Sequence, residues 1–254
     1  MTLCIDIGNS RTTFGLLENG TVRATEHESS RHLSYKRALL TLQRLLKDIE
    51  PGAVTAAGIA SVVPFLTTLV VNAATEAVGR TPVVISADAS VINTKYDDPN
   101  SVGADRLCNA AAAYLAAQGA AIVVDCGTAA TIDCVGADGT FLGGAILSGY
   151  RTTALALARA TARLSDIELA LPSHALGTST NECLQSGVVL GTTFAIEGVL
   201  RRIIEEAYEG KQPSLLVTGG HHKIFSSLTS FSVTAAPDLV LQGIEILTRK
   251  MASN

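Results

Sequence analysis

Two short loops in the chain carry an aspartate followed two positions later by a glycine, each directly after an apolar run. The first reads Asp6-Ile7-Gly8-Asn9-Ser10 and the second Asp125-Cys126-Gly127-Thr128. Glycine lets the backbone approach a phosphate closely, so that successive main-chain N–H groups point at it. The adjacent carboxylate suits Mg²⁺, which takes one or two carboxylates together with phosphate oxygens. One such loop alone is more often an ordinary turn, but two of them favour a polyphosphate site.

The two loops belong to a longer repeat whose offset is 119 residues, the difference between positions 6 and 125. At this offset Asp6, Gly8, Thr12, Gly20 and Thr21 coincide with Asp125, Gly127, Thr131, Gly139 and Thr140. Asn19-Gly20 and Asp138-Gly139 are both hairpin turn signals. The repeated unit is therefore a strand, an acidic glycine loop, a hairpin and another strand. Chance coincidence of two β-meanders is the alternative, and five matches at one offset argue against it.

Apolar periodicity fills the rest of the chain with helices and strands. We expect helices over residues 33–49, 66–78 and 194–208, and strands over residues 56–62, 82–86 and 215–218. The repeat then predicts an α/β fold of two similar halves, residues 1–118 and 119–254. A cleft between such halves is a natural site for a small molecule.

A third group of residues with chemical potential precedes an Ala-rich segment. Asp105 and Arg106 are expected in the first turn of that helix, where an aspartate alone would be an ordinary response to the helix dipole. With the arginine beside it, Asp105 suits the removal of a proton from an acceptor hydroxyl. Thr218-Gly219-Gly220 is either another point of close approach to a nucleotide or a helix-entry turn. We expect His221 and His222 at the surface, since they lack a Cys/His partner set.

Composition excludes several classes of protein. An apolar fraction of 47% and a charged fraction of 17% are typical of a chain with a sizeable core, not of a disordered one. The net charge of −4 gives no general attraction to nucleic acid or to an anionic membrane. The run from Leu107 to Val124 is interrupted by polar residues and is better explained by a buried helix and strand. No secretory signal is evident and the five cysteines form no Cys-x-x-Cys pair, so we expect reduced thiols and a cytoplasmic location.

Seven motifs follow one another along residues 3 to about 245: Asp6-Ile7-Gly8-Asn9, Ser61-Val62-Val63-Pro64, Tyr96-Asp97-x-Pro99, Gly103-Ala104-Asp105-Arg106, Asp125-x-Gly127-Thr128-Ala129, Gly143-Gly144-x-Ile146 and Thr218-Gly219-Gly220. In this order they resemble the type III pantothenate kinases. The resemblance implies the duplicated actin-like, ribonuclease H-like fold of acetate and sugar kinases, Hsp70 and actin. It implies a homodimer that uses ATP to phosphorylate pantothenate to 4′-phosphopantothenate, the first step of coenzyme A biosynthesis. It also implies a divalent cation such as Mg²⁺, and K⁺ or NH₄⁺.

The resemblance further assigns residues to roles. Asp105 would be the general base, Asp125 would hold the monovalent cation, and Asp6 would hold Mg²⁺ through water. ATP contacts would come from Asp6, Ile7, Gly8, Asn9, Ser10, Arg11, Thr12, Thr13 and Thr128. Pantothenate contacts would come from Tyr96, Gly103, Ala104, Asp105, Arg106 and Thr180.

Three positions depart from the family pattern. Ser148 stands where the family has proline in the glycine-rich segment 143–149, which we expect to be a loop with one rigid φ angle fewer. Ser10 replaces a threonine and keeps the hydroxyl, and Ala130 replaces a second threonine. None removes a proposed catalytic group, so we expect effects on affinity more than on activity.

Three other functions are compatible with the fold. A kinase of the same fold that acts on another small hydroxyl or carboxylate acceptor would lack the need for Tyr96 and the segment 103–106. A non-catalytic accessory protein for gene expression would not need Asp6, Asp105 and Asp125 together. An actin-like assembly protein would normally carry inserted subdomains, for which the chain is too short.

Overall fold

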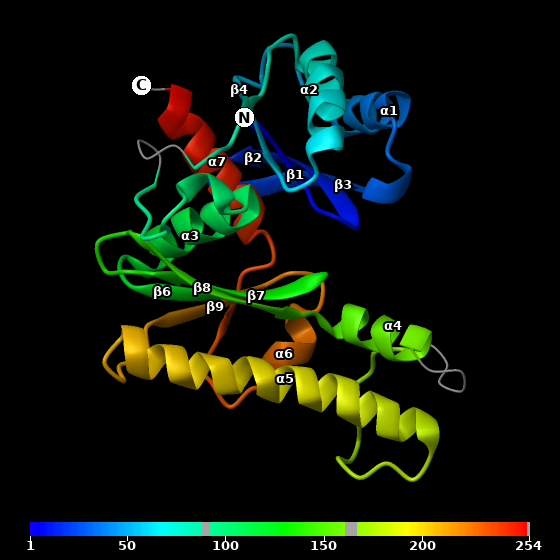
Figure 1. Cartoon of the computed structure of the whole chain (residues 1–254). Coiled ribbons are helices and arrows are strands. Elements are labelled where there is room, and N and C mark those ends of the chain that lie inside the picture. Colours follow the sequence, from blue (N-terminus) through cyan, green and yellow to red (C-terminus); the bar gives the residue numbers. More distant parts are fainter. Residues whose placement is uncertain (88–91, 161–166, 253–254) are drawn as a thin grey trace. The chain divides into compact units, whose positions relative to one another are not determined.

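The computed structural model describes residues 1–87, 92–160 and 167–252, and the chain divides into two compact units (Figure 1). The first unit comprises Met1–Ala116, Gly139–Phe141 and Asp238–Asn254. The second unit comprises Ala117–Asp138 and Leu142–Pro237. Each unit contains one five-stranded sheet with helices packed on it.

The sheet of the first unit has the strand order β3-β2-β1-β4-β5. Its strands are β1 (Thr2–Ile7), β2 (Arg11–Glu18), β3 (Thr21–Ser29), β4 (Ala56–Ser61) and β5 (Val83–Val84). The first three are antiparallel neighbours, whereas β4 runs parallel to β1 and β5 parallel to β4. Asn19 and Gly20 form the turn between β2 and β3 with φ angles of 52° and 79°, as expected of a tight hairpin.

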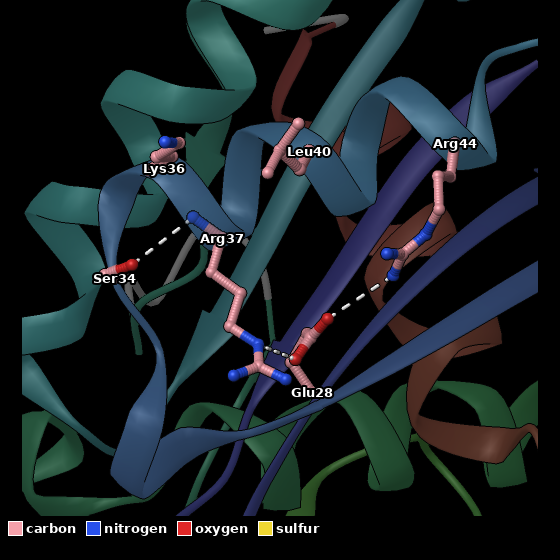
Figure 2. A pocket seen from close by; sticks show the side chains of 6 residues that line it. All are labelled: Glu28, Ser34, Lys36, Arg37, Leu40 and Arg44. Carbon is pink, nitrogen blue, oxygen red and sulfur yellow. Dashed lines mark hydrogen bonds and ion pairs between the residues drawn. The ribbon is translucent and has the colours of Figure 1, made fainter.

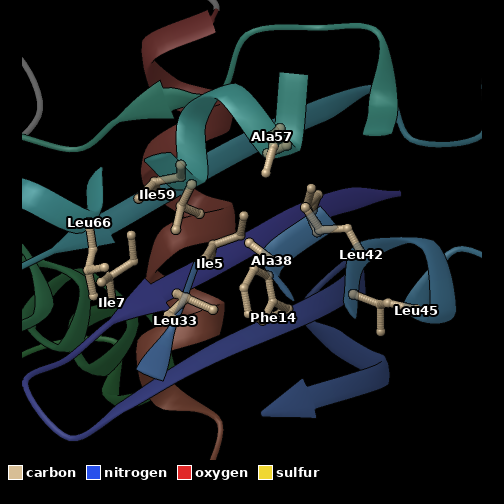
Figure 3. Close-up of a cluster of buried hydrophobic side chains, with 14 of the residues drawn as sticks. Ile5, Ile7, Phe14, Leu33, Ala38, Leu42, Leu45, Ala57, Ile59 and Leu66 are labelled. Carbon is tan, nitrogen blue, oxygen red and sulfur yellow. The ribbon is translucent and has the colours of Figure 1, made fainter. Parts of the chain in front are cut away.

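Helices cover both faces of this sheet. Helix α1 (Tyr35–Leu45) and helix α2 (Pro64–Val78) bury their apolar sides against it in one hydrophobic cluster (Figure 3). Helix α2 begins at Pro64, whose missing N–H costs nothing there, and ends at Gly79, whose φ is 69°. Helix α7 (Leu239–Ala252) packs against β1 and β4, and Gly243 allows it to approach the backbone of helix α3 (Ala104–Ala117) closely. Two short 3₁₀ turns, Ser30–His32 and Pro99–Ser101, complete the unit.

The second unit repeats this plan with the strand order β8-β7-β6-β9-β10. Its strands are β6 (Ala121–Cys126), β7 (Ala129–Val135), β8 (Phe141–Ser148), β9 (Ser214–Thr218) and β10 (Thr234–Ala235). Its helices are α4 (Tyr150–Ala160), α5 (Thr180–Ala207) and α6 (His222–Leu228). Side chains of β6, β7, β9 and α5 form its hydrophobic cluster, with Tyr150, Ile196 and Phe225 fully buried.

The predicted duplication is confirmed, because β6 pairs antiparallel with β7 and parallel with β9 just as β1 pairs with β2 and β4. One detail of the predicted alignment is wrong. Asp6 pairs with Thr13, but Asp125 pairs with Thr131, so Thr131 corresponds to Thr13 and not to Thr12. The loop after β6 is one residue shorter, and a fixed offset cannot reveal such a deletion.

Other expectations need correction. Residues 238–254 lie with the first unit, whereas we expected everything after residue 118 in the second half. Residues 143–148 belong to strand β8 and are not a loop. Helix α5 begins at Thr180 instead of near residue 194. Its first half contains Gly187 and Gly191, which lower helix propensity but do not prevent the helix from forming. Helices α4, α6 and α7 were not expected.

Helix α5 is, among the helices that the structure describes, the one long and apolar enough to cross a membrane by length and composition. Its buried side chains, including Val188, Ile196 and Leu200, pack in clusters of the second unit. A core helix with an apolar inner side accounts for the same composition.

Candidate functional site

The loop after β1 is held in shape by main-chain and serine contacts. The N–H of Gly8 donates to the carbonyl of Arg11 at 3.1 Å, which closes the turn. The hydroxyl of Ser30 donates to the carbonyl of Gly8 at 2.7 Å and lies 2.9 Å from the hydroxyl of Thr12. Ser30 therefore positions this loop, although nothing in its sequence surroundings singled it out.

The residues predicted to bind ATP in the first unit differ in exposure. Asn9, Ser10 and Arg11 are exposed at the tip of the loop, and Asp6 is half-buried at the end of β1. Ile7 and Thr12 are fully buried, and Thr13 is nearly so, with its hydroxyl 3.2 Å from Nδ1 of His27. Ile7, Thr12 and Thr13 thus shape the loop, while Asp6 and the three tip residues are open to a ligand.

The start of helix α3 presents Asp105, as predicted. Its Oδ1 accepts a hydrogen bond from the N–H of Arg106 at 2.8 Å. Burial raises the pKa of the Asp105 carboxyl above its ordinary value, and the N–H and positive charge of Arg106 offset this only in part. A Cβ atom on Gly103 would lie 2.5 Å from Oδ1 of Asp105, so glycine is required for this carboxylate position. Ala104 is buried and contributes through its backbone.

Arg106 is buried and lies beside two aromatic rings. Its Nη1 donates to the hydroxyl of Tyr96 at 2.9 Å. Its guanidinium carbon lies 5.3 Å from the ring centre of Phe141 and 5.9 Å from that of Tyr96. The predicted contact residues Tyr96 and Arg106 are therefore joined in the structure. Phe141 was not predicted, although it lies only two residues after the Asp138-Gly139 turn.

The loop after β1, the residue after β4 and the segment before α3 meet at the carboxyl ends of the parallel strands β1 and β4. The N–H of Val62, one residue beyond β4, donates to the carbonyl of Ile7 at 3.1 Å, and a Cβ atom on Gly103 would lie 3.5 Å from Cγ1 of Val62. Burial and the negative charges of Asp6 and Asp105 raise the pKa of the Cys108 thiol, so both carboxylates lie near enough to that thiol to act on its charge. Ligands of α/β proteins bind at this end of parallel strands.

The second unit carries the corresponding group at the ends of β6 and β9. Asp125 is half-buried, and a Cβ atom on Gly127 would lie 3.3 Å from its Oδ1. Gly219, with φ of 84°, leaves no room for a Cβ atom beside Asp125 and the backbone of Cys126. Burial and the charge of Asp125 raise the pKa of Cys126 to about 12, so this thiol stays protonated. The absence of a side chain at Gly219 therefore lets the backbone after β9 lie close to the Asp125 loop.

Thr128 is exposed, and its carbonyl is held by residues at the start of α4. It accepts hydrogen bonds from the N–H of Gly149 at 3.2 Å and from the hydroxyl of Thr152 at 2.5 Å. A Cβ atom on Gly149 would collide with the carbonyls of Gly127 and Thr128. Neither Gly149 nor Thr152 was predicted to support the site.

Two predictions for the second unit have different outcomes. His221 and His222 are half-buried instead of lying at the surface: the N–H of His221 donates to the carbonyl of Cys126 at 3.0 Å, and Nδ1 of His222 lies 2.8 Å from the carbonyl of Gly219. Burial lowers the pKa of His221, so its ring is neutral at pH 7. Thr180 is the exposed first residue of α5, and its predicted role stays a prediction.

A surface hollow of about 370 Å³ lies over β3 and α1 (Figure 2). It is lined by Glu28, Ser34, Lys36, Arg37, Leu40 and Arg44. Glu28 is buried and accepts from Nε of Arg37 at 2.6 Å and from Nη2 of Arg44 at 3.4 Å. None of the predicted site residues lines this hollow, and its ion pairs explain its polar residues.

The carboxylates of the two glycine loops suit a cation that is also bound by a ligand better than a metal held by protein side chains alone. Within residues 1–87, 92–160 and 167–252, no group of three or more His, Cys, Asp or Glu side chains is placed to hold a metal. Mg²⁺ commonly binds through one or two carboxylates plus substrate phosphates and water. Asp6, half-buried beside a preformed loop, suits that arrangement.

The chain matches one protein family over most of its length. Residues 2–202 match the family model described as type III pantothenate kinase. The type III pantothenate kinase of Dehalococcoides mccartyi (strain CBDB1) is 35% identical over 96% of this chain and 94% of its own length. That of Desulfatibacillum aliphaticivorans is 33% identical over the full length of both chains.

Solved structures show the same fold at low sequence identity. The activator of 2-hydroxyisocaproyl-CoA dehydratase from Clostridium difficile, with bound ADPNP, has a TM-score of 0.61 at 11% identity and covers 99% of this chain and 96% of its own. A putative Baf family transcriptional activator from Campylobacter jejuni has a TM-score of 0.58 at 18% identity and covers 99% of this chain and 100% of its own. The fold is therefore the predicted actin-like α/β fold. Together with the full-length matches, these findings place the chain in the type III pantothenate kinase family.

Proposed function

We propose that the chain transfers the γ-phosphate of ATP to the primary hydroxyl of pantothenate, giving 4′-phosphopantothenate, the first step of coenzyme A biosynthesis. The observation that carries the proposal is the half-buried Asp105 at the start of α3, with its raised pKa, beside the Arg106–Tyr96 pair. A carboxylate with a raised pKa is a better proton acceptor than an ordinary aspartate. Family membership supports the same activity.

Asp105 acts as the general base. Its carboxylate takes the proton of the pantothenate hydroxyl as the hydroxyl oxygen bonds to the γ-phosphorus, and the bond from that phosphorus to ADP breaks. Tyr96, Arg106 and the backbone of Gly103 and Ala104 hold the acceptor. Since phosphoryl transfer depends mostly on positioning and charge neutralisation, rigid support of these groups is what the reaction requires.

The nucleotide is assigned to the two glycine loops. The exposed residues Asn9, Ser10 and Arg11 of the loop after β1, and the exposed Thr128 of the loop after β6, are the proposed nucleotide contacts. Asp6 would hold Mg²⁺ through water, and the bound ion would neutralise phosphate charge. Asp125 is assigned to K⁺ or NH₄⁺. Its half-buried carboxylate between Gly127 and Gly219 supports a site for a weakly hydrated cation.

Pantothenate is thus the proposed small-molecule partner, and a second copy of the chain is the proposed protein partner. Between residues 187 and 198 the exposed residues of α5 are uncharged: Gly187, Gly191, Phe194, Ala195 and Gly198. A side this poor in charge supports a homodimer interface there. The net charge of −4 supports neither nucleic acid nor a membrane surface as a partner, in keeping with a cytoplasmic enzyme.

An acceptor screen tests the proposal. Purified chain is incubated with ATP, Mg²⁺ and K⁺, and ADP release is measured with pantothenate, pantothenol, glucose, N-acetylmannosamine or acetate. Pantothenate is expected to give the highest kcat/KM, and pantothenol, which lacks the carboxylate, a lower one. Equal or higher turnover of a sugar or acetate would reject pantothenate as the substrate. Full activity with Na⁺ as the sole monovalent cation would reject the role of Asp125.

A further inference from the structure

Phe141 reaches the first unit from the start of β8, whose later residues belong to the second unit. Its N–H donates to the carbonyl of Asn93 at 2.8 Å, and its carbonyl accepts from the N–H of Lys95 at 3.0 Å. An isolated β-bridge to Thr94 accompanies these bonds. The backbone of Phe141 therefore fixes the segment that leads into Tyr96.

The side chain of Phe141 is fully buried and contacts both members of the Arg106–Tyr96 pair. Its ring centre lies 5.3 Å from the guanidinium carbon of Arg106 and 5.6 Å from the ring centre of Tyr96, with 31° between the two ring planes. Since a phenylalanine side chain forms no ordinary hydrogen bond, it acts here only through its ring face and its volume.

A buried guanidinium needs surroundings that tolerate its charge. The face of an aromatic ring attracts a cation within about 6 Å of its centre, and the attraction is larger when both groups are removed from water. The ring of Phe141 meets this condition with Arg106, a residue that is only 6% exposed to solvent. The hydrogen bond to Tyr96 then fixes the plane of the guanidinium, because Nη1 must point at that hydroxyl.

We infer that Phe141 is a positioning residue of the acceptor site, acting through Arg106. By holding the guanidinium against its ring and the Tyr96 segment in register, Phe141 presets the geometry with which Arg106 binds the anionic acceptor. The inference rests on the proposed function. It predicts an effect on acceptor binding, because Phe141 touches neither Asp105 nor the loop after β1 in any described contact.

The test compares Phe141→Leu with Phe14→Leu. Phe14 is also fully buried, also in the first unit, and belongs to the core cluster over β1 and β2. Phe141→Leu is expected to raise KM for pantothenate about tenfold, the order of loss for a desolvated cation–π contact. KM for ATP and kcat should change less than about twofold, because no described contact joins Phe141 to Asp105 or to the loop after β1. Phe14→Leu should lower the melting temperature comparably and leave KM for pantothenate unchanged.

A double-mutant cycle separates positioning from general damage. In an Arg106→Gln background, Phe141→Leu should change KM for pantothenate by less than about twofold, since the two residues act as one unit. Phe141→Met, whose flexible side chain adapts to gaps in a core but carries no ring, provides a second variant if the leucine variant folds poorly. Additive effects in the cycle, or equal KM changes in Phe141→Leu and Phe14→Leu, would overturn this inference but leave the proposed function standing. Absence of pantothenate turnover by the unchanged chain would overturn the proposed function as well.

Discussion

Gly103 and Asp105 are so close that a Cβ atom at residue 103 would lie 2.5 Å from Oδ1 of Asp105. Real Cβ atoms do not approach an oxygen so closely, so any side chain at residue 103 displaces the carboxylate. The sequence Gly-Ala-Asp-Arg is thereby explained by packing as well as by chemistry. The glycine makes room for the general base.

Gly103→Ala is therefore expected to impair catalysis with little loss of stability. A displaced base should lower kcat by about 10²-fold or more, within the range that general base catalysis contributes. Gly119→Ala is the matched control, because a Cβ atom there meets nothing within 4 Å. Steady-state kinetics and melting temperatures of the two variants check this. Wild-type kcat in Gly103→Ala would show that Asp105 tolerates displacement and is not the base.

Gly219→Ala tests the support of Asp125 in the second unit. Its φ of 84° and its contact with the Asp125 loop both exclude a side chain, and backbone strain of this kind costs about 1–3 kcal/mol. We expect a lower melting temperature and a weaker activation by K⁺. Gly220→Ala, one residue later, is the control because a Cβ atom at Gly220 meets nothing within 4 Å. Identical K⁺ activation in both variants would contradict the assignment.

Burial of Asp105 gives a pH dependence of stability with a definite sign. Because burial raises the pKa of Asp105, the ionised carboxylate is less stable in the folded chain than in the unfolded one. The stability contributed by Asp105 is present below the ordinary aspartate pKa of about 3.9 and is lost as pH rises through the folded pKa. Asp105→Asn should therefore increase the free energy of unfolding at pH 7. A urea titration in which the variant is less stable than the wild type at pH 7 would refute this.

Glu28 under the hollow on α1 behaves in the opposite way. Burial alone would raise its pKa, but hydrogen bonds from Thr41 and Arg37 outweigh burial and lower it. Its stability contribution is present above about pH 4.3 and is lost as pH falls through the lower folded pKa. Glu28→Gln should cost about 1.5–3 kcal/mol at pH 7, the range for hydrogen bonds to charged groups. Glu18→Gln, in the exposed pair with Arg23, should cost far less, and equal losses in urea unfolding would contradict this account.

The duplicated sheets and the hairpin turns could be predicted from sequence because they depend on local signals. Asn19-Gly20 and Gly139 adopt the positive φ angles that such turns require. Helix α7 carries apolar residues such as Leu239, Ile244 and Leu247, but its packing on β1 and β4 depends on contacts with strands near the other end of the chain, which periodicity does not report. The expected helix over residues 194–208 covers only the second half of α5, whose first half contains Gly187 and Gly191.

The acidic residues of the site could be predicted because their spacing repeats, whereas their supports could not. Ser30 and Phe141 hold Gly8 and Arg106 through contacts made only after folding. The half-buried His221 was misplaced for the same reason, since its contact is a main-chain bond to Cys126. The residues next to Ser30, Phe141 and His221 in the sequence form no motif that would indicate these contacts.

The most direct test of the central claim is ADP release by purified wild-type chain and by Asp105→Asn, with ATP, Mg²⁺ and K⁺, with and without pantothenate. We predict pantothenate-dependent release by the wild type and a kcat lower by about 10²- to 10⁴-fold in the variant, the span of general base catalysis. Melting curves should show that the variant is folded. Wild-type turnover in Asp105→Asn, or no pantothenate-dependent release by the wild type, would contradict the assignment.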